Sequence, residues 1–363
     1  MIPLRPISAY VATLKPELPP QAFEPARSRL LWLPVHATVL AAGILGILQH
    51  RVPVLLLPVV SLVMGLSFAG LAFLGHETLH GAIVRNHRLR YLVGFVGFLP
   101  FTVSPRLWIA WHNLMHHGNA NKPGVDPDAY PTLDEHRASA LVRMSTDYLG
   151  VGRGRLRGLT SLGIGFTAHS AHQLFAAGPR GTLPRRELVL AWLETLAGLV
   201  AWLALLPLLG GVGFLFAYVL PLMVGNAIVM AYIFTNHSLS PHTRVNDPLA
   251  NSLSVTVPRW VDFVTLRFGF HVEHHLFPWM SSRHAPLVRK LVLERWPERY
   301  QSMPFWRALL LIHRTPRVYV DDETLLDPET GERVATLASR EAPKGSGTGS
   351  MPPREPEHPR RAA

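Results

Sequence analysis

The feature that most constrains the fold of this chain is a set of four long apolar stretches. Each is about as long as the roughly 20 helical residues needed to cross a hydrocarbon core. They lie near residues 30–49, 52–75, 188–209 and 212–235. His50 and Arg51 alone separate the first two, and Gly210 and Gly211 alone separate the last two, so each pair predicts a tight helical hairpin. The sequence therefore predicts an all-α integral membrane protein with four transmembrane helices.

The distribution of positive charge predicts how these hairpins are oriented. Lys and Arg are frequent before the first apolar stretch, between the hairpins and after the last stretch, whereas the predicted turns carry only Arg51. Since Lys and Arg accumulate on the cytoplasmic side of membrane proteins, both termini and the middle segment are predicted to be cytoplasmic. This accounts for most of the net charge of +11 without a nucleic-acid partner. It also offers a basic surface to anionic headgroups or an acidic electron carrier.

The remaining segments complete a predicted division of the chain. Residues 1–29 form a cytoplasmic N-terminal segment, 30–340 one membrane-embedded domain, and 341–363 a disordered tail rich in Pro, Gly and charge. Within that domain a cytoplasmic helical cap consists of residues 76–187 and 236–340. The shorter apolar runs at 91–103 and 159–178 are expected to be re-entrant or interfacial, because a crossing at 91–103 would put the basic middle segment on the wrong side.

The chain has no cysteine. This excludes a disulfide framework, a thiolate zinc site and an iron–sulfur cluster held by these residues. Any electrons that the protein needs are therefore expected from another protein.

Histidines are grouped in three short motifs, HETLH at 76–80, HNLMHH at 112–117 and HVEHH at 271–275. Residues three or four apart share a helix face, so each motif can direct two imidazoles at one point, and the further histidine of a doublet can reach a second metal. All three motifs lie on the predicted cytoplasmic side, which makes their convergence simple. The predicted metal ligands are His76, His80, His112, His116, His117, His271, His274 and His275.

Other polar residues near the motifs are weaker candidates. Asn236-His237 ends the fourth apolar stretch as His76 ends the second, so His237 is a further candidate ligand. His169 and His172 are interpreted as ordinary interfacial histidines. Carboxylates often orient ligand rings. The candidates for such a role are Glu77, Glu273, Asp126 and Asp128, with the amide of Asn236 beside them.

The number of histidines indicates which metal they bind. A zinc site uses three or four protein ligands, so eight or nine imidazoles are too many for one such ion. Two metals with four or five nitrogens each, and an open position for O2, would use the whole set. Iron suits this role because it changes oxidation state and zinc does not. The predicted cofactor is therefore a pair of iron ions.

These motifs resemble the three histidine boxes of the membrane fatty acid desaturase family. Trp111 before the second motif, the Asn121 to Asp128 segment after it and Leu276-Phe277-Pro278 after the third are also similar to that family. The resemblance extends from about Leu71 to Met280. It implies a mushroom-shaped protein with four spans and a cytoplasmic di-iron cap. Such enzymes reduce O2 with two external electrons and remove two hydrogens from adjacent methylenes of an acyl chain.

The resemblance also implies a branch and a partner. Three-residue gaps in the first two motifs are more similar to the acyl-lipid branch than to the acyl-coenzyme A branch, so a lipid-linked fatty acyl substrate is expected. No fused haem-domain signature occurs in the sequence. A separate ferredoxin-type electron donor with its reductase is therefore expected.

Three alternatives remain open at this point. His76-Glu77-Thr78-Leu79-His80 also satisfies the zinc-protease pattern, with Glu77 as general base, although Ile83 and Asn86 do not fit its extended form. A metal transporter would instead place its site near the bilayer midplane. Di-iron hydroxylases and ketolases of lipids, alkanes, sterols or carotenoids carry similar motifs, so they differ from desaturases in product and not in metal site.

Overall fold

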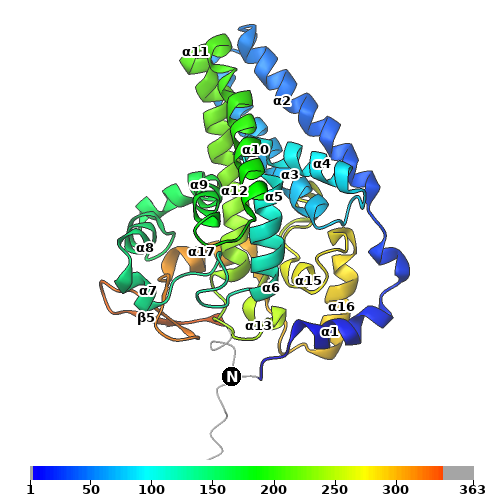
Figure 1. Cartoon of the computed structure of the whole chain (residues 1–363), viewed down its shortest axis with the longest axis vertical. Coiled ribbons are helices and arrows are strands. Elements are labelled where there is room, and N and C mark those ends of the chain that lie inside the picture. The colour runs from blue at the N-terminus through cyan, green and yellow to red at the C-terminus, as the bar shows by residue number, and fades with distance from the viewer. Residues whose placement is uncertain (1–2, 338–363) are drawn as a thin grey trace, which may run out of the picture.

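The computed structural model describes residues 3–337, except the side chains of residues 148 and 149. The chain is mostly helical, with a narrow end and a wide body (Figure 1). The narrow end contains α2 (Trp32–Leu48), α10 (Arg185–Leu203), α11 (Leu206–Phe214) and the first part of α12 (Leu220–His237), which η9 (Leu215–Val219) joins to α11. The helix α3 (Leu57–Leu79) runs from this end into the body.

Three helical segments are long and apolar enough to cross a membrane. They are Arg27–Leu48, Val54–Leu79 and Leu206–His237. These segments cover the first, second and fourth predicted spans to within two residues and identify a membrane protein. Gly210 has a φ of 65°, which breaks α11 at the predicted Gly-Gly turn.

The predicted third span, residues 188–209, differs from the prediction. It is divided between α10 and the start of α11, because the helix breaks at residues 204 and 205. The helix α10 also begins in the charged residues Arg185, Arg186 and Glu187 and includes Glu194. Glu194 accepts hydrogen bonds from Ser104 Oγ (2.6 Å) and Arg106 Nε (2.8 Å), so its charge is compensated inside the protein.

The apolar run at 91–103 forms a sharply bent pair of helical segments. One contains α4 (His87–Phe98) and η5 (Leu99–Phe101). The other contains α5 (Pro105–Trp108), the π-helix η6 (Ile109–His116) and α6 (His117–Asn119), and the two are bent by 99°. The bend follows from Thr102 in the left-handed region and from Ser104, whose hydroxyl caps α5 by accepting from Leu107 N. A bent pair of this kind is either a broken span or a re-entrant loop.

The body is completed by shorter helices. They are α1 (Ile7–Leu14), η1 (Lys15–Glu17), η2 (Pro20–Phe23), η3 (Arg27–Leu31), η4 (Val54–Leu56), α7 (Leu133–Ala138), α8 (Ala140–Met144), η7 (Ser145–Leu149), η8 (Leu156–Leu159), α9 (Thr160–Ala177), α13 (Pro248–Asn251), α14 (Arg259–Val264), α15 (His271–Leu276), η10 (Ser282–His284), α16 (Ala285–Arg295) and α17 (Phe305–Arg314). The predicted tail, residues 341–363, lies outside the described residues.

Two small sheets correct the all-α prediction. β1 (Ser254–Thr256) pairs in parallel with β2 (Ser302–Pro304). β3 (Val318–Tyr319), β4 (Thr324–Leu326) and β5 (Arg333–Ala335) form an antiparallel sheet in that order. Each strand has two or three residues, which is too short for an alternating pattern to be visible in the sequence.

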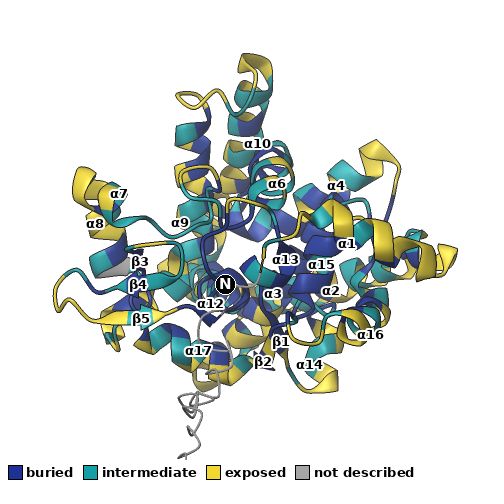
Figure 2. Cartoon of the chain, turned by 90° about the horizontal axis from the view of Figure 1, so that it is seen from below, coloured by how far each residue is buried: buried dark blue, intermediate teal, exposed yellow. Residues whose placement is uncertain are grey.

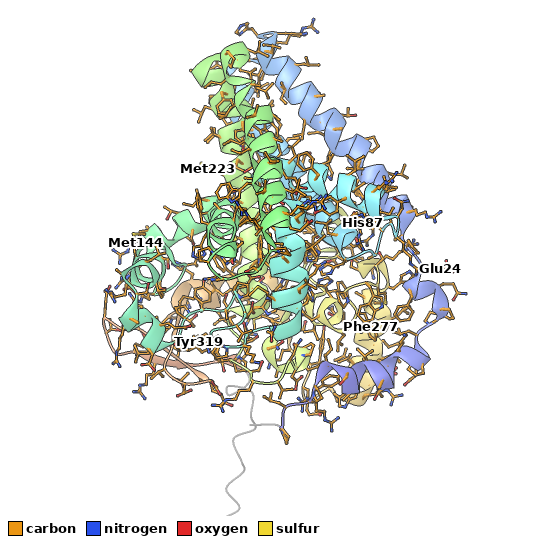
Figure 3. The ribbon with its side chains drawn as sticks, in the orientation of Figure 1. Glu24, His87, Met144, Met223, Phe277 and Tyr319 are labelled. Atoms are coloured by element: carbon orange, nitrogen blue, oxygen red, sulfur yellow. The ribbon has the colours of Figure 1, made fainter. Side chains whose placement is uncertain are left out.

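Two apolar cores hold the body together. The larger one includes Phe68, Phe98 and Trp108 and joins α3 to the bent pair. The smaller one packs α1 against α15 and α16 through Tyr10 and Phe277. Phe277 lies low in the wide body, far from Met223 near the narrow end (Figure 3). In Figure 2, dark blue marks buried residues around α13 and α15 near the centre. The N-terminal segment is thus packed against the helix that carries the third histidine motif.

Candidate metal centre

The first motif lies at the end of α3. His76 and His80 are four residues apart, one turn of helix, and His80 caps the helix C-terminus. Gly81 follows with a φ of 83°, a conformation that glycine adopts without strain and that ends the helix. His76 is 8% exposed, so the last turn of α3 presents its imidazoles inside the body.

The second motif lies on η6 and α6. The Trp108 ring stacks on the His112 ring, with centroids 4.3 Å apart, and fixes its plane. The His112 and His116 rings are also stacked, 5.1 Å apart. π-helical turns are rare and often occur at functional sites, because the wider turn re-aims side chains.

The third motif forms the short helix α15, and His237 joins it from the end of α12. His271 and His275 are almost fully buried, with exposed fractions of 4% and 1%. His237 Nδ1 donates to the Asn251 carbonyl oxygen at 3.0 Å, which holds its Nε2 toward α15.

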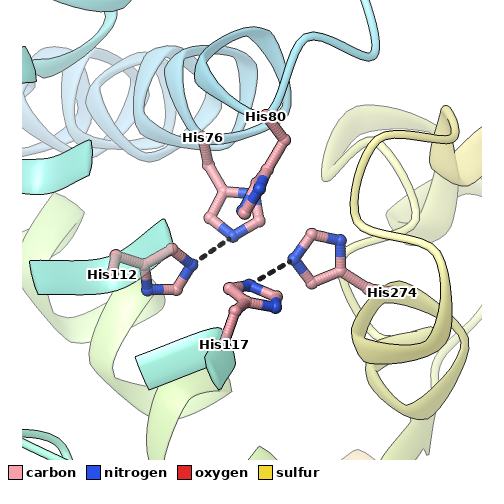
Figure 4. Close-up of side chains that lie close together, drawn as sticks. All are labelled: His76, His80, His112, His117 and His274. Carbon is pink, nitrogen blue, oxygen red and sulfur yellow. Dashed lines mark hydrogen bonds between the residues drawn. The ribbon is translucent and has the colours of Figure 1, made fainter. Parts of the chain in front are cut away.

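The nine predicted histidines converge as two neighbouring groups. The five-histidine group contains His76, His80, His112, His117 and His274 (Figure 4). The four-histidine group contains His116, His237, His271 and His275. In each group one nitrogen per ring lies within 4.8 Å of all the others. Each doublet contributes one ring to each group, so the second and third motifs serve both.

The distances between ring nitrogens fit metal ligands. In the five-histidine group, His76 Nε2 lies 3.1 Å from His112 Nε2, and His117 Nε2 lies 3.1 Å from His274 Nε2. Two nitrogens bound at a right angle to one ion, each at about 2.1 Å, would be about 3 Å apart. The buried Nε2 of His80 has no hydrogen-bond partner among the described residues. It is therefore free to bind a metal.

The distances between nitrogens in the four-histidine group are explained better by a bound cation than by hydrogen bonds between the rings. His237 Nε2 lies 2.6 Å from His271 Nε2 and 3.2 Å from His275 Nε2, which are themselves 3.0 Å apart. Because neutral His237 uses its proton at Nδ1, its Nε2 carries a lone pair. If His271 and His275 both donated to it, their two protons would be forced together. A cation at the centre of the triangle removes this conflict.

The protonation of most of these rings suits a metal. His116 is the exception, because burial is outweighed by the neighbouring Asp126, which raises the pKa of His116 to about 9, so a metal bound there would displace a proton. Burial, with the neighbouring imidazoles, lowers the pKa of His271 and of His275 well below the usual range. Burial likewise lowers the pKa of His274 to about 3. Neutral imidazole is the form that binds metals, so no deprotonation is needed at these positions.

Asp126 contacts a ligand ring directly, and Asp128 lies beside the same ring, with its Oδ2 3.5 Å from His116 Nδ1. His116 Nδ1 contacts Asp126 Oδ1 at 3.0 Å, and Asp126 is itself held by the backbone N–H of Asn121 at 2.8 Å. Asp128 accepts from Trp111 Nε1 at 3.0 Å and contacts His169 Nε2 at 2.8 Å. His169 thus supports a carboxylate and lies outside both histidine groups, while His172 belongs to neither group.

Glu77, Glu273 and Asn236 do not contact a ligand ring. Glu77 accepts from Ser281 Oγ (2.6 Å) and Ser282 N (2.9 Å) and forms an ion pair with Arg29. Because it follows His76 by one residue, its side chain points about 100° away from that ring. It therefore ties the end of α3 to the N-terminal segment and to the loop after the third motif. This also removes the free general base that the protease alternative needs.

Glu273 and Asn236 have their own surroundings. Glu273 accepts from Ser254 Oγ (2.6 Å), Arg289 Nε (2.7 Å) and Tyr300 OH (2.6 Å), so it fastens α15 to β1 and α16. The side-chain amide of Asn236 is buried without a hydrogen-bond partner among the described residues. Glu273 is one residue from His274 and bonds to residues outside both histidine groups, whereas Asn236 is next to His237 and makes no such bond among the described residues.

Aromatic residues form a wall that the histidine spacing does not reveal. The Phe268 ring lies 4.9 Å from the His76 ring and 4.6 Å from Phe73. A small cavity opens between Phe73, Leu266, Phe268 and Phe270 and reaches His76, His271 and His274. In the sequence, this wall is indicated only by the apolar residues Leu266, Phe268 and Phe270 just before the third motif. Glu77, Arg267 and Ser282 also line this cavity, so it is a small space beside the histidines with one aromatic side and one polar side.

Comparison with known proteins agrees with this geometry. The family model described as fatty acid desaturase matches residues 53–307. The sn-1 oleoyl-lipid 12-desaturase of Synechocystis sp. is 27% identical over 87% of this chain and 89% of its own length. The chloroplastic omega-6 fatty acid desaturase of Glycine max is 22% identical over 80% of this chain and 69% of its own length.

A third relative, the sn-1 acyl-lipid omega-3 desaturase (ferredoxin) of Synechocystis sp., is 25% identical over 81% of this chain and 84% of its own length. Enzymes with these names are oxidoreductases that act on fatty acyl chains. The family model covers most of the chain, including all three histidine motifs and His237. This chain therefore belongs to the fatty acid desaturase family.

Proposed function

We propose that this protein introduces a double bond into a fatty acyl chain of a membrane lipid, using O2 and a pair of iron ions. The observation that supports this most strongly is the division of nine histidines into two adjacent groups. One iron would be held by His76, His80, His112, His117 and His274. The other would be held by His116, His237, His271 and His275.

The chemistry of the reaction explains why such a site is needed. A methylene in the middle of an acyl chain has no acidic proton, so an acid–base pair alone cannot break its C–H bond. Two bound irons would supply the redox chemistry by which O2, with two electrons and two protons from outside, takes two hydrogens from adjacent carbons and leaves as two waters. The chain's own residues have three roles here. They hold the irons, exclude water and fix which carbons come close.

Residues around the irons have separable tasks in this proposal. Asp126 keeps the His116 ring in one orientation, and Trp108 does the same for His112. Phe268 and Phe73 offer apolar contact to an acyl chain beside His76. An apolar wall both binds the chain and limits the access of water to the irons.

The substrate class and the arrangement in the membrane are part of the same proposal. Two relatives carry names that specify lipid-linked substrates, sn-1 oleoyl-lipid and sn-1 acyl-lipid, so a chain esterified to a lipid is the first substrate to test. We infer four spans, with α10 and the following turn as the third, and a cytoplasmic cap because of the positive charge at 76–187 and after 236. Electrons would come from a ferredoxin-type protein and its reductase.

Expression in a host whose membranes contain saturated and monounsaturated chains tests the proposal. With a ferredoxin system and iron supplied, mass spectrometry of the lipids is expected to show a product two mass units lighter than its precursor. His274→Ala is the matched inactive control. A product sixteen units heavier would mean hydroxylation and would contradict desaturation while sparing the metal site. No product and one zinc per chain would contradict both.

A further inference from the structure

One side of the body carries large aromatic residues on its surface. Trp260 and Phe263 on α14 are 71% and 68% exposed, and Trp306 on α17 is 68% exposed. Exposed arginines flank them on the same two helices. We define the aromatic face by Arg259, Trp260, Phe263, Trp306, Arg307 and Arg314. Aromatic residues with basic neighbours are typical of surfaces that lie at a membrane–water boundary.

The two helices of this face are brought together by β1 and β2. These strands are parallel, with Thr256 opposite Pro304, and α14 and α17 begin within a few residues of their ends. Both helices therefore leave the same end of one ribbon. Figure 2 shows α14 and α17 on the same side of the body, with β1 and β2 beside them.

Contacts with α2 and α12 show where this face lies relative to the membrane-crossing segments. The Phe263 ring lies 5.3 Å from Trp32, the first residue of α2. On the other helix, Phe305 lies 4.7 Å from Tyr232, five residues before the end of α12. Both contacts occur where membrane-crossing segments enter the body. The Phe263 contact thus places the aromatic face beside the start of α2, and the Phe305 contact with the buried Tyr232 anchors α17 to α12 through the core.

The charges of the face complement an anionic headgroup layer. Arg259, Arg307 and Arg314 form no ion pair with a carboxylate in the described part of the chain. The one acidic residue of α14 and α17 is Asp262, whose Oδ1 is buried. Arginine pairs with the phosphate of a lipid through two hydrogen bonds. The face therefore offers three cations to headgroups and three aromatic rings to the acyl boundary.

We propose that the aromatic face rests in the headgroup layer of the bilayer and binds anionic phospholipid there. This inference rests on the proposed function in one respect, because it takes the cavity beside the histidines as the place where an acyl chain binds. The chain leads from α14 directly to Leu266, Phe268 and Phe270, which line that cavity. A lipid whose headgroup sits at the aromatic face has its acyl chains next to that cavity. The face would thus deliver a lipid-linked chain sideways from the membrane.

Spin labels test the position of the face without any need for activity. The chain has no cysteine, so single labels can be placed on an unmodified background. Phe263→Cys and Trp306→Cys are the test variants, labelled with a nitroxide in nanodiscs that contain phosphatidylglycerol. Leu66→Cys, 53% exposed on α3, is the lipid reference. Lys290→Cys, whose side chain is 74% exposed on α16, is the water reference.

The ratio of collisions with O2 to collisions with a water-soluble nickel chelate reports the depth of each label. We expect this ratio at 263 and 306 to be several-fold higher than at 290 and to approach that at 66. A ratio equal to that at 290 would overturn the proposal. Labels that are wet in nanodiscs and become protected only with an acidic ferredoxin-type protein would also overturn it, in favour of a protein partner.

A second comparison tests the lipid preference. In nanodiscs of phosphatidylcholine alone, the ratio at 306 is expected to fall relative to phosphatidylglycerol, and Arg307→Glu combined with Arg314→Glu is expected to remove that difference. An unchanged ratio in both lipids would contradict the role of the arginines. None of these readings depends on turnover, so failure of the face and failure of the desaturase proposal are distinguishable.

Discussion

At the scale of single residues, adjacent histidines belong to different groups. His116 and His275 lie in the four-histidine group, whereas their neighbours His117 and His274 lie in the five-histidine group. Consecutive residues on a helix point about 100° apart, so the two rings of one doublet can reach two different ions. The binding of each ion can therefore be weakened separately, by substituting a ligand of one group only.

Removing one ligand is expected to release one ion first. His274→Ala should reduce iron at the five-histidine group, and His271→Ala should reduce it at the four-histidine group, each to about one ion per chain with less than about a tenth of parent activity. The exposed His172, which lies outside both groups, is the control for substitution itself. Iron per chain is measured by elemental analysis. Full iron with full activity in either variant would contradict the assignment of ligands.

The contact between Asp126 and His116 gives a milder prediction. Asp126→Asn keeps the shape but loses the anionic acceptor of His116 Nδ1. Iron affinity is expected to fall about 10- to 100-fold, as is usual when a carboxylate that orients a ligand is lost. Competition with a chelator measures this, with the exposed Asp134→Asn as control. Equal affinity in both variants would mean that Asp126 only supports the local fold.

At the scale of elements, α3 and α4 approach closely through glycines. A Cβ at Gly97 would lie 2.7 Å from Gly75 Cα and 2.7 Å from the Leu71 carbonyl oxygen. Close approach through small residues is a common way for membrane helices to pack. Gly97→Ala is expected to push α4 away from α3 and to lower thermal stability in detergent. Gly211→Ala, where a Cβ meets nothing within 4 Å, should be neutral.

The ion pair between Arg29 and Glu77 joins the N-terminal segment to the end of α3. Both side chains are nearly buried, so Glu77→Gln leaves an uncompensated cation and is expected to cost about 3–5 kcal/mol of stability. The Arg295 and Glu17 pair, with both side chains more than a third exposed, is the matched control. Glu17→Gln should leave the unfolding temperature nearly unchanged, because water screens an exposed pair. Equal losses in thermal unfolding would contradict this difference.

At the scale of the whole molecule, features that depend on a pattern of one residue type could be predicted from the sequence, whereas contacts between distant segments could not. Long apolar runs predicted the places of α2, α3 and α12. Ligand spacing identified eight of the nine histidines that converge, and the ninth, His237, was a candidate because it ends the fourth apolar stretch. Their assignment to two groups depends on how four helical segments meet, α3, η6 with α6, α12 and α15. The third span was less clear because Glu194 and the charges at its start interrupt the apolar pattern.

The roles of polar residues beside the ligands were the least predictable part of the site. Glu77 and Glu273 are next to histidines in the sequence, yet each bonds to another element, Glu77 to Ser281 about 200 residues away and Glu273 to Arg289 on the neighbouring helix α16. Asp126 and Asp128 were predictable because they lie in a short loop after the motif that they support. The wall at Phe73 and Phe268 arises from two segments almost 200 residues apart, which spacing within one motif does not reveal.

Iron content and its state test the central proposal most directly. The protein is purified from iron-replete cells, and metals are measured by elemental analysis together with Mössbauer spectroscopy. About two irons per chain, in nitrogen-rich environments that change when electrons and O2 are supplied, is the result that this account predicts. One zinc per chain without iron would contradict it.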